Sequence, residues 1–168
     1  MYETNRLILR KAVFSDWEQM YRNIWCHEET ARYMLWAVTE SEAAAKERME
    51  RTIAFQQSHH AWLVVEKESG KAIGFAGLRE ESGVCEDTGI AVGPRYVGKG
   101  YGTEILNELV RIAKEGLNAH GFIATCRSEN EASQKMILGC GFRFSHAEPR
   151  VDKRNGEKYT LEFYRKEI

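Results

Sequence analysis

A glycine-rich stretch between two apolar segments constrains the fold of this chain more than any other feature. The stretch runs from Gly93 to Glu104 and has glycines at positions 98, 100 and 102. The run 88–92 before it is typical of a buried strand, and the apolar residues of 105–117 recur at helical spacing. Glycines leave the backbone N–H groups at the start of a helix unshielded, and such groups bind anions. The sequence therefore predicts a strand, a pyrophosphate-binding loop and a helix.

Two familiar phosphate-binding patterns fit this loop poorly. The dinucleotide pattern Gly-x-Gly-x-x-Gly fails because Thr103 stands at its third glycine. The Walker A pattern is satisfied from Gly93 to Lys99, but Gly100 replaces the Ser or Thr whose hydroxyl holds magnesium. A degenerate nucleotide-binding loop, and a turn that binds no ligand, therefore remain as alternatives.

A third pattern, Arg/Gln-x-x-Gly-x-Gly/Ala, is filled at every required position by Arg95, Gly98 and Gly100. The loop thus resembles the coenzyme A loop of the GNAT superfamily of acetyl-coenzyme-A-dependent N-acetyltransferases. Further matches are similar to its branch that acetylates ribosomal-protein N-termini: Thr4-x-Arg6-Leu7-x-Leu9-Arg10, Ile73-Gly74-x-x-Gly77-Leu78, Asn130-x-x-Ser133 before Gly141-Phe142, and Asn155-Gly156-x-x-Tyr159. Because that branch includes acetylases of small amines and antibiotics, the resemblance leaves the acceptor open.

Composition sets wider limits. The 168 residues are 43% hydrophobic and 29% charged, which predicts a single domain over 1–168. A net charge of −1 argues against nucleic acid or an anionic membrane as partner. The four cysteines and five histidines lack metal-ligand spacing, so no metal is expected. The N-terminus lacks signal-peptide order and no apolar run reaches the roughly 18 residues of a membrane span, so cytoplasmic location is the default expectation.

Hydrophobic periodicity predicts a mixed sheet covered by helices. The expected strands are short apolar runs between turn signals, at 7–9, 61–65, 72–78, 88–92, 122–126 and a final pair ending with 159–164. Strand 122–126 should run parallel to 88–92 because a helix connects them. Helix starts are predicted at capping boxes: Ser15 with Glu18, Thr39 with Glu42, and Ser128 with Glu131. Residues 26–38 are predicted as an aromatic-rich loop, and Asn155-Gly156 as a two-residue hairpin turn.

This order resembles the GNAT fold over nearly the whole chain. The resemblance implies an α/β (mixed α+β) class, with a central, mostly antiparallel sheet of about seven strands, a splayed parallel pair and about four flanking helices. It also implies transfer of an acetyl group from acetyl-coenzyme A to a primary amine, on a protein N-terminus or a small molecule, by direct attack in a ternary complex. A coenzyme A sensor without catalysis is the alternative of another class. Both a monomer and a homodimer remain open.

The resemblance also assigns site residues. Cofactor contacts are expected from the end of the strand, the loop and the next helix: Ile90, Ala91, Val92, Arg95, Val97, Gly98, Lys99, Gly100, Tyr101, Gly102, Thr103 and Asn130. Asp87 stands where the family more often has a Glu as general base, so a relaying water is expected, with Glu86 as a rival. The family uses a backbone N–H of this strand for the oxyanion, and Gly89 inside the strand indicates a bulge or a close backbone approach, either of which would free backbone groups; a glycine that only packs against a bulky neighbour is the alternative.

The leaving thiolate has a less obvious donor. Ile137 occupies the place where many family members have a tyrosine, which shifts the catalytic role to Ser133 or to solvent. Asn130 is expected to bind the pantetheine amides, although both Asn130 and Ser133 could instead cap a helix. Acceptor contacts are expected from the aromatic-rich loop and from the last hairpin, and the aromatic candidates are Trp25, His27, Tyr33 and Trp36. These side chains could equally form the core of that loop.

Overall fold

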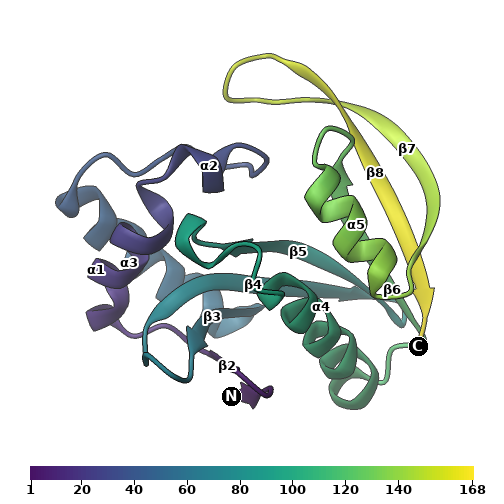
Figure 1. Ribbon diagram of the computed structural model, residues 1–168, viewed down its shortest axis with the longest axis horizontal. Helices are drawn as coiled ribbons and strands as arrows, with labels where there is room; N and C mark the ends of the chain where they lie inside the picture. The colour runs from purple at the N-terminus through teal and green to yellow at the C-terminus, as the bar shows by residue number, and fades with distance from the viewer.

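The computed structural model describes residues Met1–Ile168 and contains one eight-stranded sheet (Figure 1). The strands lie in the order β1-β2-β3-β4-β5-β6-β8-β7, and every neighbouring pair is antiparallel except β5 and β6. Their bounds are β1 Tyr2–Glu3, β2 Leu7–Arg10, β3 His60–Glu66, β4 Ala72–Glu81, β5 Val84–Val92, β6 Gly121–Arg127, β7 Arg143–Val151 and β8 Lys158–Glu167. The mostly antiparallel sheet with one parallel pair confirms the predicted fold class.

Helices cover both faces of this sheet. The α-helices are α1 Trp17–Met20, α2 Glu28–Ala31, α3 Glu42–Ser58, α4 Tyr101–Arg111 and α5 Glu131–Gly139. Single π-helical turns, Tyr21–Trp25 and Ile112–Gly116, continue α1 and α4. No helix is both long and apolar enough to cross a bilayer.

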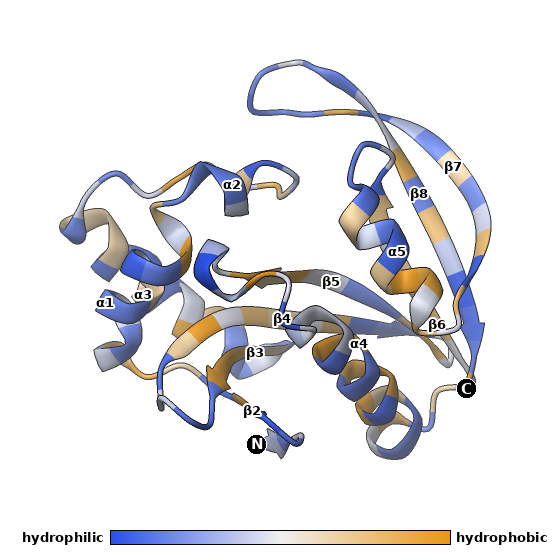
Figure 2. Cartoon of the chain, viewed as in Figure 1, coloured by the Kyte–Doolittle hydropathy of each residue, from blue (hydrophilic) through white to orange (hydrophobic).

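Alternation along β3 divides the core into two clusters. Trp62 and Val64 pack into the larger cluster with Leu109 of α4, whereas Leu63 packs on the opposite face with Met49 of α3. Successive strand side chains point to opposite faces, so a continuous apolar strand can serve two helical layers. Figure 2 shows the matching pattern on α4, with hydrophobic residues on the side toward the sheet and polar ones outward. The site described below therefore has a rigid sheet with a separate helical layer on each face.

The first helical segment begins differently from the capping-box prediction. A 3-10 turn, Phe14–Asp16, precedes α1. The side chain that accepts a backbone N–H at the start of this turn is that of Asp16, not Ser15. The Asp16 carboxylate accepts the backbone N–H of Val13 at 2.9 Å and pairs with Arg10 at 2.7 Å. A carboxylate at this position accepts the backbone N–H and also forms a two-point ion pair with the guanidinium, whereas a serine hydroxyl has neither the charge nor the second oxygen for that pair.

The next two predicted caps lie two residues too early. Ser41, not Thr39, caps α3 by accepting the N–H of Ala44 at 3.2 Å. Asn130, not Ser128, caps α5. In both cases the residue immediately before the helix is the one whose oxygen reaches the third N–H of the first turn.

The structure adds one strand, β1, and corrects three further local predictions. The two-residue β1 is too short to leave a periodic signal. β5 begins at Val84, four residues before the predicted strand. The last hairpin turns over the residues between Asp152 and Glu157, whose backbones are hydrogen bonded at 2.8 Å, and not over two residues alone. The loop predicted at 26–38 contains the single helical turn α2.

Candidate active site

The parallel strands β5 and β6 pair over a short stretch and then separate. Their paired residues end at Glu86 and Ile123. Beyond that point the carboxylate of Asp87 accepts the backbone N–H of Thr125 at 2.8 Å. A cleft of about 430 Å³, here called the seam cleft, opens between the strands and is lined in part by Asp87 and Gly89. Figure 1 shows β8 and β7 running away from β5 on this side of the molecule.

The carboxyl group of Asp87 has a raised pKa. Burial in the wall of the cleft is the main cause that raises its pKa to about 7, and the negative charge of Glu86 adds to it. The N–H groups of Thr125 and Gly89 lower the pKa and offset part of this shift. Glu86 itself is engaged by Arg79, whose Nη2 lies 2.7 Å from its carboxylate. A carboxyl group with a pKa near neutrality is suited to accept a proton during catalysis.

The bulge predicted at Gly89 lies directly beside this group. The register against β4 pairs Gly77 with Gly89 and Leu78 with Asp87, so Thr88 is left without a partner. Gly89 has a φ of +126°, which L side chains rarely adopt. From the bulge onward β5 pairs with β4 on one edge and with no strand on the other. Backbone groups are therefore available to a ligand inside the cleft.

The glycine-rich loop leads from the end of β5 into α4. None of the backbone N–H groups from Val97 to Thr103 donates to an acceptor of the protein. Gly98 and Gly100 have φ values of +79° and +80°, which turn the chain so that these donors stay free. A Cβ on Gly102 would approach Sδ of Met136 to 2.6 Å, so this third glycine lets α4 and α5 come close together. The loop thus presents a row of free N–H donors at a helix N-terminus, an arrangement that suits an anion.

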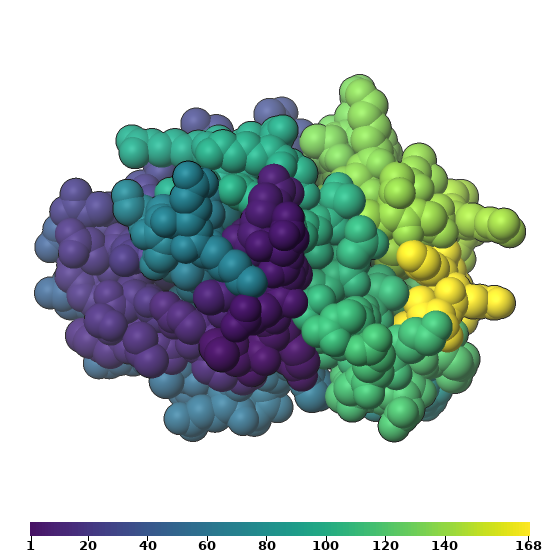
Figure 3. All heavy atoms as spheres, turned by 60° about the horizontal axis from the view of Figure 1, so that its bottom comes forward, coloured from purple at the N-terminus to yellow at the C-terminus, as the bar shows by residue number.

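An N-terminal segment fixes the loop from outside. Arg6 donates from Nη1 to the carbonyl of Lys99 at 2.8 Å and from Nε to Glu104 at 2.7 Å. Its guanidinium carbon lies 4.5 Å from the ring centre of Tyr101, and Thr4 also hydrogen bonds to Glu104. Figure 3 shows the purple N-terminal segment lying against the green helix α4. The Thr4 and Arg6 positions of the N-terminal motif therefore hold the loop and the start of α4 in place.

The start of α5 forms the far wall of the seam cleft. Asn130 and Ser133 both line it, and Oδ1 of Asn130 accepts the N–H of Ser133 at 3.1 Å. The Asn130 amide nitrogen remains free to donate to a ligand. Ile137 is buried below them at 2% exposure. Of the predicted strand contacts, Ile90 lines the cleft, whereas Ala91 and Val92 do not and instead contribute to the strand ladder with β4.

A second cavity, here called the aromatic pocket, lies on the α3 side of the sheet. Its volume is about 790 Å³, and it shares Trp36, Phe75, Thr88 and Gly89 with the seam cleft. The two cavities therefore meet at the bulge. Of the predicted acceptor residues, Trp25 and Trp36 line the aromatic pocket and Tyr33 lines the seam cleft, whereas His27 lines neither. The ring of His27 instead bonds to the carbonyl of Arg22 at 2.8 Å.

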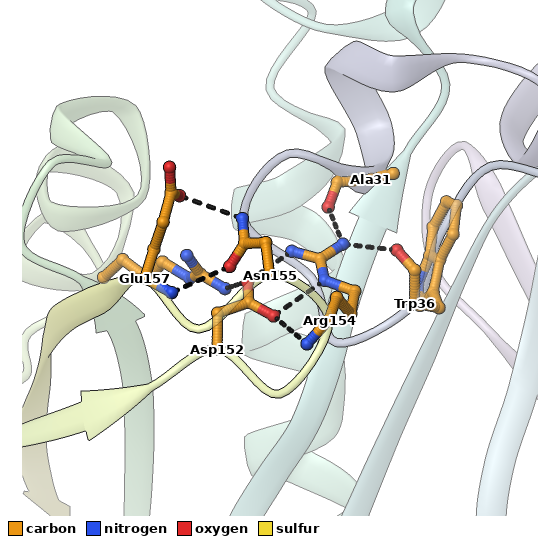
Figure 4. A network of polar contacts seen from close by, with 7 residues as sticks. Ala31, Trp36, Asp152, Arg154, Asn155 and Glu157 are labelled. Atoms are coloured by element: carbon orange, nitrogen blue, oxygen red, sulfur yellow. Dashed lines mark hydrogen bonds and ion pairs between the residues drawn. The ribbon is translucent and has the colours of Figure 1, made fainter.

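The final hairpin is fastened to the aromatic segment by a cluster of charges. Figure 4 shows Arg154 reaching the carbonyl oxygens of Trp36 and Ala31, and these contacts measure 2.6 and 3.3 Å. Asp152 accepts from Arg154 and from Arg127, in each case at 2.7 Å. The two guanidinium groups hold the pKa of the Asp152 carboxyl well below its usual range. This Arg154 latch ties the last hairpin to Trp36, which lines the seam cleft.

Several residues of the two cavities were not expected from the sequence. The sequence pattern places Phe75 and Thr88 in strands without indicating a pocket, and Arg48 has the spacing of an ordinary solvent-facing helix position. Tyr159 lines the seam cleft, and the guanidinium carbon of Arg127 lies 3.9 Å from the centre of its ring. The Asn155-Gly156-x-x-Tyr159 motif was the one sequence signal that pointed to this corner of the site.

Comparisons with known proteins agree with this architecture. The family model described as an acetyltransferase (GNAT) domain matches residues 6–143. An uncharacterized N-acetyltransferase, YoaA of Bacillus subtilis (strain 168), is 25% identical over 167 residues, covering 96% of this chain and 93% of the relative. A GNAT-family acetyltransferase from Bacillus anthracis superposes with a TM-score of 0.84 at 20% identity, covering 98% of this chain and 96% of that one.

A further solved structure has the same fold at lower identity. RimL, a ribosomal L7/L12 alpha-N-protein acetyltransferase in complex with coenzyme A, superposes with a TM-score of 0.80 at 17% identity, over 98% of this chain and 96% of that one. At this identity the likeness establishes the shared fold. With the family model spanning most of its length, the chain belongs to the GNAT acetyltransferase family.

Proposed function

We propose that this protein, as one domain over 1–168, transfers an acetyl group from acetyl-coenzyme A to a primary amine, by direct attack within a ternary complex. The acceptor is either a protein N-terminus or a small-molecule amine. The observation that carries the proposal is the row of uncommitted N–H groups from Val97 to Thr103, in which Gly102 packs against Met136, a residue that lines the seam cleft. A row of free donors beside a narrow cleft of strand edges suits a ligand with a pyrophosphate and a long amide-bearing arm.

The residues around the loop fit coenzyme A in chemical type. The free amides of Gly98, Gly100 and their neighbours would bind the pyrophosphate, with positive charge from Arg95 and Lys99 nearby. The unpaired edge of β5 at Ile90 and the free amide nitrogen of Asn130 would bind the pantetheine amides. Of the remaining predicted contacts, Val97, Tyr101, Gly102 and Thr103 contribute backbone donors, and Ala91 and Val92 hold the strand against β4.

The chemistry requires a proton acceptor for the ammonium. When bound, acetyl-coenzyme A supplies an activated acyl carbon: the amine nitrogen bonds to it, the thioester C–S bond breaks, and the sulfur leaves as thiolate. Asp87 would accept the proton of the ammonium, directly or through a water, because its pKa of about 7 leaves it partly ionised at neutral pH. Glu86 is the weaker candidate, since its carboxylate is already paired with Arg79.

The remaining charges have candidates in the same cleft. The Gly89 N–H already faces the Asp87 carboxylate, so other backbone N–H groups on the unpaired edge of β5 beside the bulge would stabilise the negative charge that develops on the acetyl oxygen. Ser133 would donate a proton to the leaving thiolate, since the position of Ile137 offers no hydroxyl. A microcin C7 self-immunity acetyltransferase, MccE, in complex with acetyl-coenzyme A and AMP shares the fold at 20% identity and a TM-score of 0.82, which supports the choice of cosubstrate.

Ligand-dependent stability tests the proposal directly. The thermal unfolding midpoint is measured with acetyl-coenzyme A, coenzyme A, magnesium-ATP and NADH in parallel, because a ligand that binds the folded state raises it. We expect a shift from the two coenzyme A species alone. Release of free thiol from acetyl-coenzyme A is then followed with N-terminal peptides and with small amines. A shift from magnesium-ATP alone would overturn the proposal, and coenzyme A binding without any turnover would favour a sensor.

A further inference from the structure

One cation of the aromatic pocket has no anion beside it. Arg48, on α3, places its guanidinium carbon 4.6 Å from the ring centre of Trp25 and 4.2 Å from that of Trp36. It donates one side-chain hydrogen bond, from Nη1 to Oγ1 of Thr39 at 3.0 Å. No carboxylate lies within ion-pairing distance, and the nearby charge that acts on Arg48 is the positive charge of Arg51. Most of its N–H donors therefore have no acceptor.

The charge of Arg48 is retained despite its burial. Burial, with a smaller contribution from Arg51, lowers the pKa of Arg48 to about 10, so the side chain is still cationic at neutral pH. A partly buried cation without a counter-charge is costly to the fold. The other arginine of this pocket, Arg51, has a partner, since it pairs with Glu47 at 3.8 Å. Arg48 is therefore poised for an anion that the chain does not provide.

The two tryptophans explain where Arg48 lies but leave its donors free. Stacking uses the flat faces of the guanidinium, whereas the N–H groups lie in its plane and remain available. The aromatic pocket has a second donor without an acceptor, the buried Nε1 of Trp36. Planar N–H groups on a rigid aromatic support suit the two oxygens of a carboxylate or phosphate.

The cavity connects Arg48 to the place of transfer. Arg48 lines the same pocket as Thr88 and Gly89, and these two residues also line the seam cleft beside Asp87. The wall between the two ends is apolar and includes Phe75. A molecule with an anionic group at Arg48 would therefore reach the bulge with its other end. The pocket volume of about 790 Å³ lies in the range of small-molecule sites.

We propose that Arg48 binds the anionic group of the acceptor, and that the acceptor is a small primary amine carrying a carboxylate or phosphate, such as an amino acid. The inference rests on the proposed acetyl transfer and narrows its acceptor class. The amine end lies at the bulge, within reach of Asp87 and the acyl carbon, and the apolar body lies against Phe75. Arg48 then sets specificity and does not take part in proton transfer.

Matched amines that differ only in the anion test the proposal. Thiol release is measured with phenylalanine against phenylalaninamide, and with phosphoethanolamine against ethanolamine, which separates carboxylate from phosphate recognition. The amide's amine has the lower pKa and is the easier nucleophile, so a preference for the acid cannot come from reactivity. We expect kcat/KM for the anionic member of at least one pair to exceed that of its neutral partner by about 10- to 100-fold.

Variants assign that preference to one side chain. Arg48→Gln is expected to remove the 10- to 100-fold preference through KM, with kcat and the neutral amine little changed. Arg48→Lys keeps the charge without the planar fork and should restore part of the preference. Lys46→Gln is the matched control, because Lys46 lies on the same helix over Trp17, at 4.7 Å from the ring centre, and does not line the pocket.

The outcomes separate this inference from the general function. Three outcomes would overturn the role of Arg48 as the binding site of the acceptor's anion, here called the Arg48 anchor, while leaving acetyl transfer intact. These are equal rates for acid and amide in the wild type, equal losses for both in Arg48→Gln, and efficient acetylation of peptides with neutral termini. If acetyl-coenzyme A gives neither a thermal shift nor turnover, the proposed function fails instead. The anchor is then tested by calorimetric binding of the acids and amides to the wild type and Arg48→Gln, where loss of acid binding supports it and unchanged binding overturns it.

Discussion

The carboxylate of Asp87 bridges β5 and β6 by accepting the N–H of Thr125 at 2.8 Å, directly beyond the last paired residues of the two strands. A single side chain thus links the two strands where their pairing ends and stands at the site proposed for proton transfer. Substitutions at Asp87 need to separate these two roles.

Asp87→Asn is expected to lower kcat by about 10²- to 10⁴-fold at neutral pH while leaving the acetyl-coenzyme A thermal shift unchanged. The asparagine oxygen can still accept the Thr125 N–H, so the strand geometry is kept. In the wild type, kcat should rise with pH through about 7, the pKa of Asp87, and this limb should vanish in the variant. A large loss in Glu86→Gln instead, with Asp87→Asn active, would assign the base to Glu86.

The same group should make folding stability depend on pH. The pKa of the Asp87 carboxyl is raised from its usual value of 3.8 to about 7 in the folded protein. As pH rises between about 4 and about 7, the unfolded chain loses this proton while the folded chain keeps it, so each increment of pH favours unfolding. We expect the wild-type unfolding free energy, measured in denaturant, to fall relative to Asp87→Asn across this window and to level off above it. Parallel profiles for the two proteins would contradict the raised pKa.

Gly98→Ala should weaken coenzyme A binding more than it weakens the fold. The position has a φ of +79°, and a Cβ added there would meet no atom within 4 Å, so the cost comes from the backbone turning away from the left-handed region, at about 1 kcal/mol. Gly141→Ala is the matched control, with a φ of +83° outside the loop. Titrated thermal shifts with coenzyme A should separate the two variants, and equal affinities would remove the loop from the binding site.

Arg154→Gln should raise KM for the acceptor and leave KM for acetyl-coenzyme A unchanged. The charged hydrogen bond to the carbonyl of Trp36 is lost, so the aromatic segment is held less firmly and KM for the acceptor should rise by about 3- to 10-fold. Lys153→Gln, at the adjacent exposed position, is the control. Steady-state kinetics against both substrates would contradict this view if KM for acetyl-coenzyme A rose instead.

Local signals in the sequence predicted the elements but not the relations between them. The glycine loop, the bulge at Gly89 and the parallel pairing of β5 with β6 all follow from short-range patterns or from chain order. Arg48 could not be found in this way, because a charged residue on a helix has the same spacing whether it faces solvent or an aromatic pocket. Asp152 and Arg154 were missed because their partners, Trp36 and Arg127, are distant in sequence.

The Arg154 latch also has a consequence for how the molecule forms. Its contacts join residues separated by 118 and 123 positions, Trp36 and Ala31 on one side and Arg154 on the other. During synthesis the earlier residues emerge first, and closing so long a loop is slow and entropically costly. Strands β2 to β6 and α4 precede Arg154 in the chain, whereas β8 follows it. Because Trp36 lines both cavities, we expect the wall that they share to be fixed only once the chain has been made beyond Arg154.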